Sequence, residues 1–319
     1  MPQPTATQVH VNAPLTNISI AYIQSADAFI ASRVFPIVPV DKKSNVYYAY
    51  TKNDWFRDEA APRGPSTESV GSGYNTDGSP SYNCKRNAIH KDIDDEVRGN
   101  FDNPLDPDRD ATQWVTQRIL LRQEVAWTST YFTTGVWGTD STPTNLWSDY
   151  AASDPISDVR TGIRTILATT GFKPNKLVLG YDVFLKLQDH PDIIDRLKYT
   201  GGATRAVTRE QLAALFDIEE VLVCEAIKAT NIEGETAAYS FVQGKHALLT
   251  YAPKVPSLLQ PSGGYIFAWK GISNGMGKSV AIKKFRMEQI TSDRIEAEYA
   301  FDQKLVAADM GYFFNGAVA

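Results

Sequence analysis

The most constraining feature of this chain is a stretch of 25 residues, Asp108 to Phe132, that contains neither glycine nor proline. It predicts one long helix. The preceding segment of about fifty residues is too polar and too rich in glycine to bury a core, since 12 of the 28 residues from Arg57 to Cys84 are Gly, Pro or Ser. An isolated two-stranded arm is only marginally stable in water. A long helix that follows such an arm therefore indicates a subunit whose arm packs against neighbouring subunits.

The start of the predicted helix is well defined. Asp106 fits the N-cap, Pro107 fits the first helical position, and Asp108 and Asp110 complement the positive end of the helix dipole. At about 1.5 Å per residue, the helix would span roughly 37 Å, enough to brace a wide and thin subunit. One side carries an apolar stripe of Ala111, Trp114, Val115, Ile119, Leu121, Val125 and Ala126.

Composition excludes several classes of protein. The 319 residues, 43% of them hydrophobic, can form two compact domains or one domain with extensions. A net charge of -5 and a pI near 5.5 argue against a protein that condenses nucleic acid, so contact with DNA could only be local and weak. Cys84 and Cys224 lack a CxxC spacing, which favours buried free thiols in a reducing compartment. With neither a signal sequence nor a long apolar run, we expect no secretion and no membrane span.

The N-terminal part of the chain predicts an arm followed by short strands. Residues 1–16 are rich in Pro, Thr, Gln and Asn and are expected to have no fold of their own. Ile18 to Val34 has apolar residues at helical spacing, which predicts an amphipathic helix. Ile37 to Val40 and Asn45 to Tyr50 predict strands. The segment from Arg57 to Cys84 predicts an extended loop or ribbon.

The rest of the chain changes pattern twice. After a helix from Asp154 to about Thr169, we expect a strand at 176–179, helices at 182–190, 193–199 and 208–216, and a strand at 218–224. Further strands are expected at 237–242, 246–251 and 265–269. About the last seventy residues show period two, which predicts antiparallel strands with one wet face. The residues expected on the dry face are Phe285, Met287, Ile295, Ala297, Tyr299 and Phe301.

Two short patterns resemble ligand sites but lack a necessary part. The sequence GMGKS, residues 275–279, suggests a phosphate-binding loop, but its first glycine is out of register and a strand is expected to follow it. Asp106 to Asp110 imitates the start of a calcium loop, but Ala111 and Gln117 stand where Gly and Glu are needed. A flexible turn and a helix cap explain these residues better, so we predict no cofactor and no metal.

An acidic run, Asp92, Asp94, Asp95 and Glu96, leaves three interpretations open. It could be a solvated face, a set of partners for arginines of a neighbouring subunit, or a place where a cation bridges a subunit contact. The first two are favoured.

Neither a DNA-binding regulator nor an enzyme is predicted. Thr208 to Phe216 resembles the first helix of a helix-turn-helix, but an apolar strand follows in place of a recognition helix. The histidines His10, His90, His190 and His246 have unrelated contexts, and no GxSxG, HExxH or dinucleotide fingerprint occurs. His190 precedes a proline at a helix end, where a basic side chain suits the terminal carbonyls. We therefore expect no catalytic residues.

Several stretches in order resemble major capsid proteins of tailed bacteriophages, which adopt the Hong Kong ninety-seven shell fold. In sequence letters they are FPIVPV at 35–40, WFRDEA at 55–60, PLDPDRDAT at 104–112, ILLRQE at 119–124, NKLVLGYDV at 175–183, DHPD at 189–192 and RLKY at 196–199. The resemblance runs from about residue 21 to residue 314. It implies an α+β capsid fold with an N-terminal arm, an extended β-ribbon loop, a spine helix, a peripheral domain and an axial α/β domain.

The resemblance also implies a division of the chain. Residues 1–45 would be the arm, 46–100 the extended loop that lies over a neighbouring subunit, and 101–169 the peripheral domain with its spine helix at 108–132. Residues 170–260 would form the axial domain, and 261–319 would be C-terminal strands that return to the peripheral domain. We expect the chain to lack the removable N-terminal segment of many relatives, so that scaffolding, if needed, would come from another protein. No residue matches the lysine and asparagine that cross-link some shells.

The function implied is that of a non-enzymatic structural protein of the virion, assembled in the cytoplasm of the host bacterium into pentamers and hexamers of an icosahedral capsid. The implied partners are copies of itself, a scaffolding protein, a portal, a decoration protein as a further candidate, and packaged double-stranded DNA held by weak non-specific contact. We expect inter-subunit contacts at Arg57, Asp58, Glu59, Arg63, Asp94 and Glu96. The alternatives are an encapsulin-type shell around cargo enzymes and a soluble α/β hydrolase or binding protein.

Overall fold

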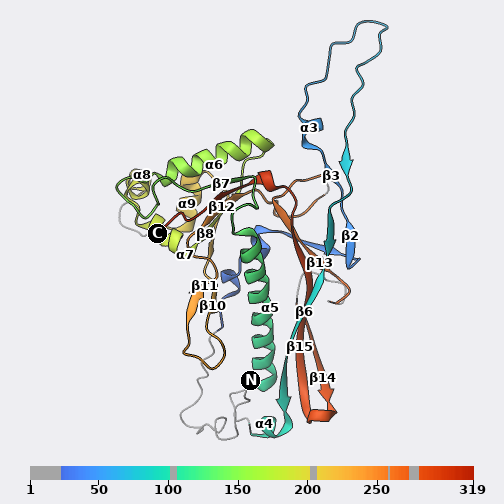
Figure 1. Ribbon diagram of the computed structural model, residues 1–319, viewed down its shortest axis with the longest axis vertical. Helices are drawn as coiled ribbons and strands as arrows, with labels where there is room; N and C mark the ends of the chain where they lie inside the picture. Colours follow the sequence, from blue (N-terminus) through green and yellow to red (C-terminus); the bar gives the residue numbers. More distant parts are fainter. Residues whose placement is uncertain (1–22, 101–105, 202–206, 258, 273–279) are drawn as a thin grey trace.

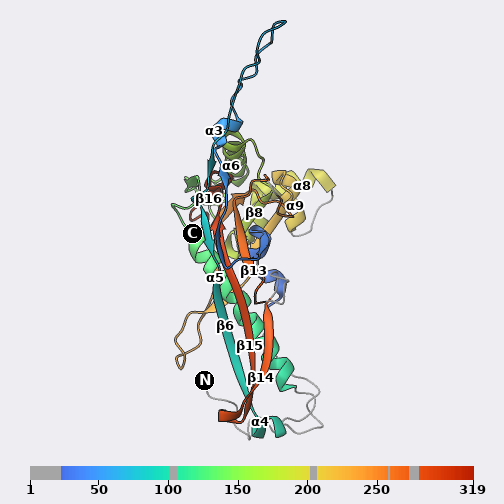
Figure 2. The ribbon, with the colours of Figure 1, turned by 90° about the vertical axis from the view of Figure 1, so that its right-hand side faces the viewer.

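The computed structural model describes residues 23–100, 106–201, 207–257, 259–272 and 280–319 of the chain. One long helix and several long strands run side by side along the longest axis, and an extended ribbon projects from one end (Figure 1). The molecule is narrow when turned by 90° (Figure 2). The subunit is therefore long and thin.

Helix α5 (Pro107–Tyr131) matches the predicted long helix within one residue at each end. The Asp106 side chain accepts hydrogen bonds from the backbone N–H groups of Asp108 and Arg109, which confirms the predicted N-cap. A row of side chains four residues apart is buried along the helix: Ala111, Val115, Ile119, Gln123, Trp127 and Tyr131.

The second half of the predicted apolar stripe of α5 is wrong. Leu121, Val125 and Ala126 are only half-buried, whereas Gln123 and Glu124 are buried. Gln123 and Glu124 can be buried here because polar groups from other parts of the chain lie next to them. The Glu124 carboxylate, for example, accepts a hydrogen bond from the N–H of Ala31.

Helix α5 packs against a sheet whose central strand is β15 (Ser292–Leu305). One edge of β15 pairs with β6 (Lys85–Asp94), and the other pairs with β14 (Ala281–Met287) and β13 (Gly264–Trp269), all antiparallel. Strand β1 (Ile37–Val40) extends the sheet parallel to β13. The predicted antiparallel C-terminal strands are therefore confirmed.

The period-two prediction has the right phase for β15 and the wrong phase for β14. Phe285 of β14 pairs with Arg294, and Lys284 pairs with Ile295. Because paired residues share a face of the sheet, Phe285 lies on the side away from α5, where it is 40% exposed. Lys284 takes the inner position, where its ammonium bonds to Asp108 at 2.7 Å. Strand β15 does turn its predicted residues into the core with α5: Ile295, Ala297, Tyr299 and Phe301.

A second sheet has the strand order β7-β16-β12-β8-β9. It contains β7 (Thr139–Ser141), β16 (Gly311–Phe314), β12 (Ala247–Thr250), β8 (Lys176–Gly180) and β9 (Glu220–Cys224). Strands β8 and β9 are parallel, as are β16 and β7, whereas β12 is antiparallel to both of its neighbours. Every residue of β8, β12 and β16 is buried, as expected for a sheet covered on both faces.

Four helices cover one face of this second sheet (Figure 1): α6 (Pro155–Thr170), α7 (Tyr181–Gln188), α8 (Pro191–Gly201) and α9 (Arg209–Phe216). They confirm the predicted alternation of helices and strands. The opposite face joins the core around α5 through Val178, Leu222, Leu248 and Phe313. The two sheets therefore share one core, and the C-terminal strand β16 belongs to the second of them.

The predicted amphipathic helix from Ile18 to Val34 is wrong over its described part. Residues 23–34 contain two separate turns, η1 (Ala26–Ala28) and α2 (Ala31–Val34). The chain breaks between them so that Phe29 and Ile30 can both be buried. Residues 1–22, which include His10, and the GMGKS motif at 275–279 lie outside the described residues.

The remaining elements are short. The predicted extended loop contains β2 (Ser44–Val46) paired with β5 (Ser81–Asn83), β3 (Ala49–Tyr50) paired with β4 (Thr76–Asp77), and helix α3 (Lys52–Trp55). A second hairpin is formed by β10 (Ile227–Ala229) and β11 (Tyr239–Phe241). Three further turns complete the chain: α4 (Asp95–Gly99), η2 (Glu288–Ile290) and η3 (Ala308–Met310). Among the described residues, every helix is too short or too polar to cross a bilayer.

Candidate assembly surfaces

Residues 44–83, which we call the ribbon, extend well beyond the two sheets (Figure 1). The end nearest the sheets is anchored by aromatic packing. Tyr82 stacks on Phe267 of β13 with ring centres 4.5 Å apart, and Tyr47 lies 5.4 Å from the same ring. The rest of the ribbon is almost entirely exposed. Its conformation is therefore held by few contacts within the chain.

An aromatic cluster lies on the ribbon beyond this anchor. The rings of Tyr50, Trp55 and Tyr74 lie 5.7–6.1 Å apart, yet 42%, 57% and 64% of these residues remain exposed. Tyr48 and Phe56 nearby are exposed as well. Large exposed apolar groups gathered in one place are typical of interaction surfaces. The density of aromatic residues here is visible in the sequence, but no sequence pattern predicted that they would form an exposed cluster.

Of the charged residues predicted to make contacts at the ribbon, some lie close together and others lie apart. Arg57 and Glu59 form an exposed ion pair at 3.5 Å, and Glu59 also accepts a hydrogen bond from Ser72 on the returning strand. Asp58 is exposed. Arg63 bonds to the carbonyl of Thr67 across the turn at the tip of the ribbon. Contacts of these residues with a neighbouring subunit remain a prediction.

The acidic run at the end of β6 is largely paired within the chain. Asp92 binds Arg294 through two bonds of 2.7 and 2.8 Å, and Asp95 binds Arg286 through two bonds of 2.7 and 2.6 Å. Hydrogen bonds from these guanidinium groups hold the pKa of both carboxyls below the usual range. Bidentate pairs of this kind also fix the geometry of the sheet end.

The other two acidic residues of the run, both predicted at a subunit contact, have different positions. Asp94 caps α4 by accepting a hydrogen bond from the N–H of Glu96, and the Glu96 side chain is exposed. No group of three metal-ligating side chains lies together among the described residues. The inter-subunit role of the run stays a prediction.

One glutamate expected on the wet face of β15 is buried. Glu298 is 1% exposed because Arg86 of β6 and Lys283 of β14 close over its carboxylate. The Lys283 ammonium lies 2.7 Å from it. A buried carboxylate is tolerated when it is paired and hydrogen-bonded, so Glu298 links three strands across the outer face of the sheet.

A second buried glutamate joins three parts of the fold. Glu124 of α5 accepts a hydrogen bond of 2.9 Å from the N–H of Ala31 at the start of α2, and the thiol of Cys224 at the end of β9 donates to its other oxygen at 3.7 Å. Burial without a cation raises the pKa of Glu124 to about 7. The N-terminal segment is thus held to α5 by a group that titrates near neutral pH.

Among the described residues, one buried pair, Ser153 and His190, resembles a catalytic dyad, but its hydrogen bonds are those of a structural contact. Ser153 and His190 lie 3.0 Å apart, and both are buried. The Asp192 N–H donates to Nδ1 of His190, so Nε2 carries the proton and donates to Ser153, which in turn donates to the carbonyl of Asp149. The imidazole cannot then act as a base toward the serine. Desolvation also lowers the pKa of His190, and its ring nitrogens meet Ser153 and the Asp192 N–H rather than the predicted carbonyls at the end of α7.

Both cysteines are buried and free, as predicted. Burial raises the pKa of Cys84 to about 11 and raises the pKa of Cys224 as well. Because the thiolate is the reactive form of cysteine, neither thiol is poised for chemistry at neutral pH.

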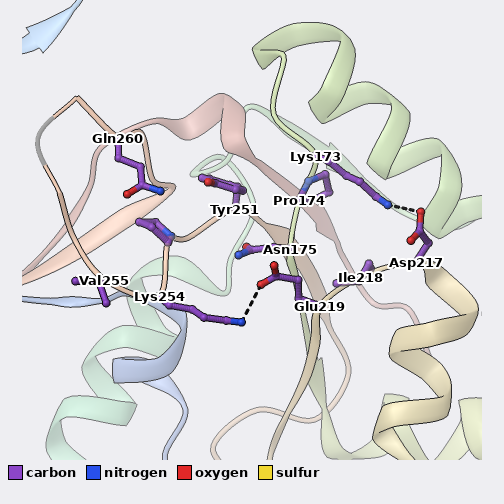
Figure 3. A pocket seen from close by; sticks show the side chains of 11 residues that line it. Lys173, Pro174, Asn175, Asp217, Ile218, Glu219, Tyr251, Lys254, Val255 and Gln260 are labelled. Atoms are coloured by element: carbon purple, nitrogen blue, oxygen red, sulfur yellow. Dashed lines mark hydrogen bonds and ion pairs between the residues drawn. The ribbon is translucent and has the colours of Figure 1, made fainter.

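A surface hollow of about 690 Å³ lies beside the loop at 251–260 (Figure 3). Lys173 pairs with Asp217 at its rim, and Lys254 pairs with Glu219 at 3.6 Å. The charges therefore cancel in pairs, and the hollow is not organised around a ligand of one charge.

No family model matches the chain. Two curated relatives are similar over almost their whole length, and both are described as major capsid proteins. One, from Burkholderia phage BcepMu, is 24% identical over 96% of this chain and 96% of the relative. The other, from Pseudomonas phage JBD67, is 25% identical over 97% of each.

Solved structures agree on the fold. A phage-related protein from Bordetella bronchiseptica RB50 has a TM-score of 0.70 at 21% identity and covers 92% of this chain and 94% of that protein. The subunit of the mature capsid of bacteriophage PhiM1 has a TM-score of 0.61 at 10% identity, covering 97% and 92%. The chain has the Hong Kong ninety-seven capsid fold. The encapsulin of Synechococcus elongatus PCC 7942 is similar as well, with a TM-score of 0.53 at 12% identity and coverage of 98% and 94%.

The predicted resemblance to phage major capsid proteins and the predicted α+β capsid fold are therefore confirmed. Among the described residues, the ribbon and its exposed aromatic cluster make few contacts with the rest of the subunit. The predicted division into arm, loop, peripheral and axial domains remains a prediction.

Proposed function

We propose that this chain is the major capsid protein of a tailed double-stranded DNA bacteriophage, and that copies of it assemble into the pentamers and hexamers of an icosahedral shell. The observation that carries the proposal is the similarity to two phage major capsid proteins over nearly the whole chain. The exposed aromatic cluster of the ribbon supports it, because this surface needs a second molecule for its burial.

In this proposal the ribbon lies over a neighbouring subunit. Within a ring of identical subunits, each contact joins two different surfaces of the subunit. The ring is complete when the rotation between neighbouring subunits adds up to a full turn. Obligate interfaces commonly bury about 2,000 to 5,000 Å² in total, and each subunit of a shell has several. The ribbon can serve both pentamers and hexamers because its own subunit holds it near the sheets, through Phe267 and the pair of Lys52 with Asp309, and leaves its tip exposed.

The proposal includes inter-subunit ion pairs at Arg57, Asp58, Glu59, Arg63, Asp94 and Glu96. The exposed pair of Arg57 and Glu59 at 3.5 Å contributes little to subunit stability. These side chains can therefore exchange their present contacts for contacts with a neighbour at small cost.

The finer functional details are also part of the proposal. The protein would have no enzymatic activity, would assemble in the cytoplasm of the host bacterium, and would need a scaffolding protein and a portal. A decoration protein is a further candidate partner. Packaged DNA would be held by weak and non-specific contacts.

The direct test is to express the chain with and without a candidate scaffolding protein, and to examine it by sedimentation and negative-stain electron microscopy. Closed particles of megadalton mass built from rings are expected. A monodisperse small oligomer under every assembly condition would contradict the proposal.

The contacts at the ribbon are tested by charge reversal. Arg57→Glu should abolish particle formation while leaving the unfolding of the isolated subunit unchanged, because Arg57 is exposed. The double variant Arg57→Glu/Glu59→Arg restores the pair within the chain and serves as the control. If the contact is with a neighbour, the double variant also fails to form particles; normal particles from it would assign the pair to the ribbon itself.

An encapsulin-type shell is the second candidate, favoured by the similarity to the Synechococcus elongatus encapsulin. The content of purified particles separates the two. A shell that encloses a protein cargo, from a genome without terminase and portal genes nearby, would favour the encapsulin.

A further inference from the structure

One side of α5 carries an unusual row of side chains. Trp114, Arg118 and Arg122 follow one another at intervals of four residues, so they lie on the same side of the helix. The Arg118 guanidinium lies 5.1 Å from the Trp114 ring centre, and the Lys91 ammonium from β6 lies 5.8 Å from it. We call Lys91, Arg118 and Arg122 the basic row.

The basic row lacks carboxylate partners within the described part of the chain. Other arginines of the same sheet, such as Arg286 and Arg294, are paired with aspartates, whereas no ion pair involves a member of the row. Arg118 and Arg122 are exposed, and like charges four residues apart destabilise a helix. The nearest acid along the row is Asp110, eight residues before Arg118 and thus about 12 Å away along the axis.

Beside the row, α5 has no exposed apolar anchor, since Trp114 is half-buried and has Arg118 and Lys91 against its ring. The exposed large hydrophobic residues of the described chain lie on the ribbon, the β10–β11 hairpin, the 251–260 loop and other places, but none is on α5. Stable protein interfaces have buried aromatic or aliphatic anchors at their centre. Interfaces with DNA are more polar and more positively charged. The row therefore suits a polyanion better than a second protein.

We propose that the basic row contacts the phosphate backbone of packaged double-stranded DNA, which places this side of α5 on the inner surface of the shell. The inference rests on the proposed function, since it requires a shell that encloses DNA. Trp114 holds Lys91 and Arg118 on one side of the helix, so their charges are presented together. Each copy contributes only a few contacts, which suits an acidic chain, and the repetition of subunits multiplies them.

The test compares two double variants with the same loss of charge. Arg118→Gln/Arg122→Gln removes the two arginines of the row, and Arg160→Gln/Arg164→Gln removes an exposed arginine pair of the same spacing from α6. Binding of a duplex of about 30 base pairs to unassembled subunits is measured by fluorescence anisotropy between about 50 and 200 mM salt. Loss of two phosphate contacts should lower the slope of log Kobs against log salt by about 1.8. The α6 variant should keep the parent slope.

Particle formation is scored separately for each protein by electron microscopy. The row variant should form normal particles and bind the duplex more weakly than the α6 variant does. Equal slopes in the parent and the row variant would overturn the inference. Folded row-variant subunits that no longer form particles would also overturn it, because the row would then be a subunit contact. Failure of the parent protein to form particles would instead count against the proposed function.

Discussion

The ribbon and the core around α5 are both rich in aromatic residues, but they use them in opposite ways. In the core, Trp127 is 1% exposed and lies against Phe35 with ring centres 5.7 Å apart. On the ribbon, Trp55 packs against Tyr50 at 5.9 Å and still remains 57% exposed. Similar pair geometry thus accompanies very different burial. The core is completed by its own chain, whereas we propose that the ribbon is completed by another molecule.

The largest expected effect separates stability from assembly. Trp127→Ala should lower the free energy of unfolding of the isolated subunit by about 3–5 kcal/mol, because it removes a fully buried side chain and leaves a cavity. Trp55→Ala removes the same side chain from an exposed site and should change that free energy by less than about 1 kcal/mol. Urea unfolding of both variants measures the difference.

The same two variants have opposite expected effects on particles. Trp55→Ala should reduce particle yield although the subunit is as stable as the parent. If Trp55→Ala assembles normally, or if it destabilises the subunit as much as Trp127→Ala does, the contrast between ribbon and core is wrong.

The second-largest expected effect concerns the buried carboxyl group of Glu124. A carboxyl whose pKa rises from 4.5 in the unfolded chain to about 7 in the folded chain binds its proton more tightly when folded. Its contribution to stability is therefore present at low pH and is lost as the pH rises from about 4.5 through 7. The loss is on the order of 3 kcal/mol.

Glu124→Gln should remove this dependence, because the amide oxygen can still accept the Ala31 N–H while no proton is exchanged. The free energy of unfolding of the variant relative to the parent should rise by about 3 kcal/mol between pH 4.5 and pH 8. Glu59→Gln, which changes an exposed carboxylate of the ribbon, is the control and should show no such trend. If the difference in free energy of unfolding between Glu124→Gln and the parent does not vary with pH, the raised pKa of Glu124 is wrong.

Local patterns predicted the parts of the fold that depend on local physics. Helix α5 and its cap at Asp106 follow from the absence of helix breakers and from capping chemistry. The apolar phase of β15 follows from period two over a central strand. Strand β14 is an edge strand, and its inner position holds Lys284, whose partner Asp108 is distant in sequence.

The candidate site was less predictable than the fold. Burial of Glu124 depends on Ala31 and Cys224, which the chain brings to α5 from both directions. The basic row depends on Lys91 reaching the ring of Trp114 from another element. Partners so far apart in sequence leave no periodic signal. The aromatic cluster of the ribbon was visible in composition, but only the structure shows that it is exposed.

The smallest expected effect contrasts glycines of the two regions. Gly311 opens β16, and a Cβ there would overlap the ring of Trp137. That ring is buried and fixed by a 2.7 Å hydrogen bond from its Nε1 to the carbonyl of Tyr131, so it cannot move aside freely. Gly311→Ala should therefore destabilise the subunit by about 1–3 kcal/mol, measured by urea unfolding.

Gly73 of the ribbon is the matched control, because nothing lies within 4 Å of an added Cβ and its φ is not in the left-handed region. Gly73→Ala should leave the unfolding of the subunit unchanged, since the ribbon contributes little to the core. If Gly73→Ala instead destabilises the subunit as much as Gly311→Ala, the ribbon must pack against its own chain more tightly than its exposure indicates. The glycines thus test the contrast between ribbon and core without changing charge or aromatic content.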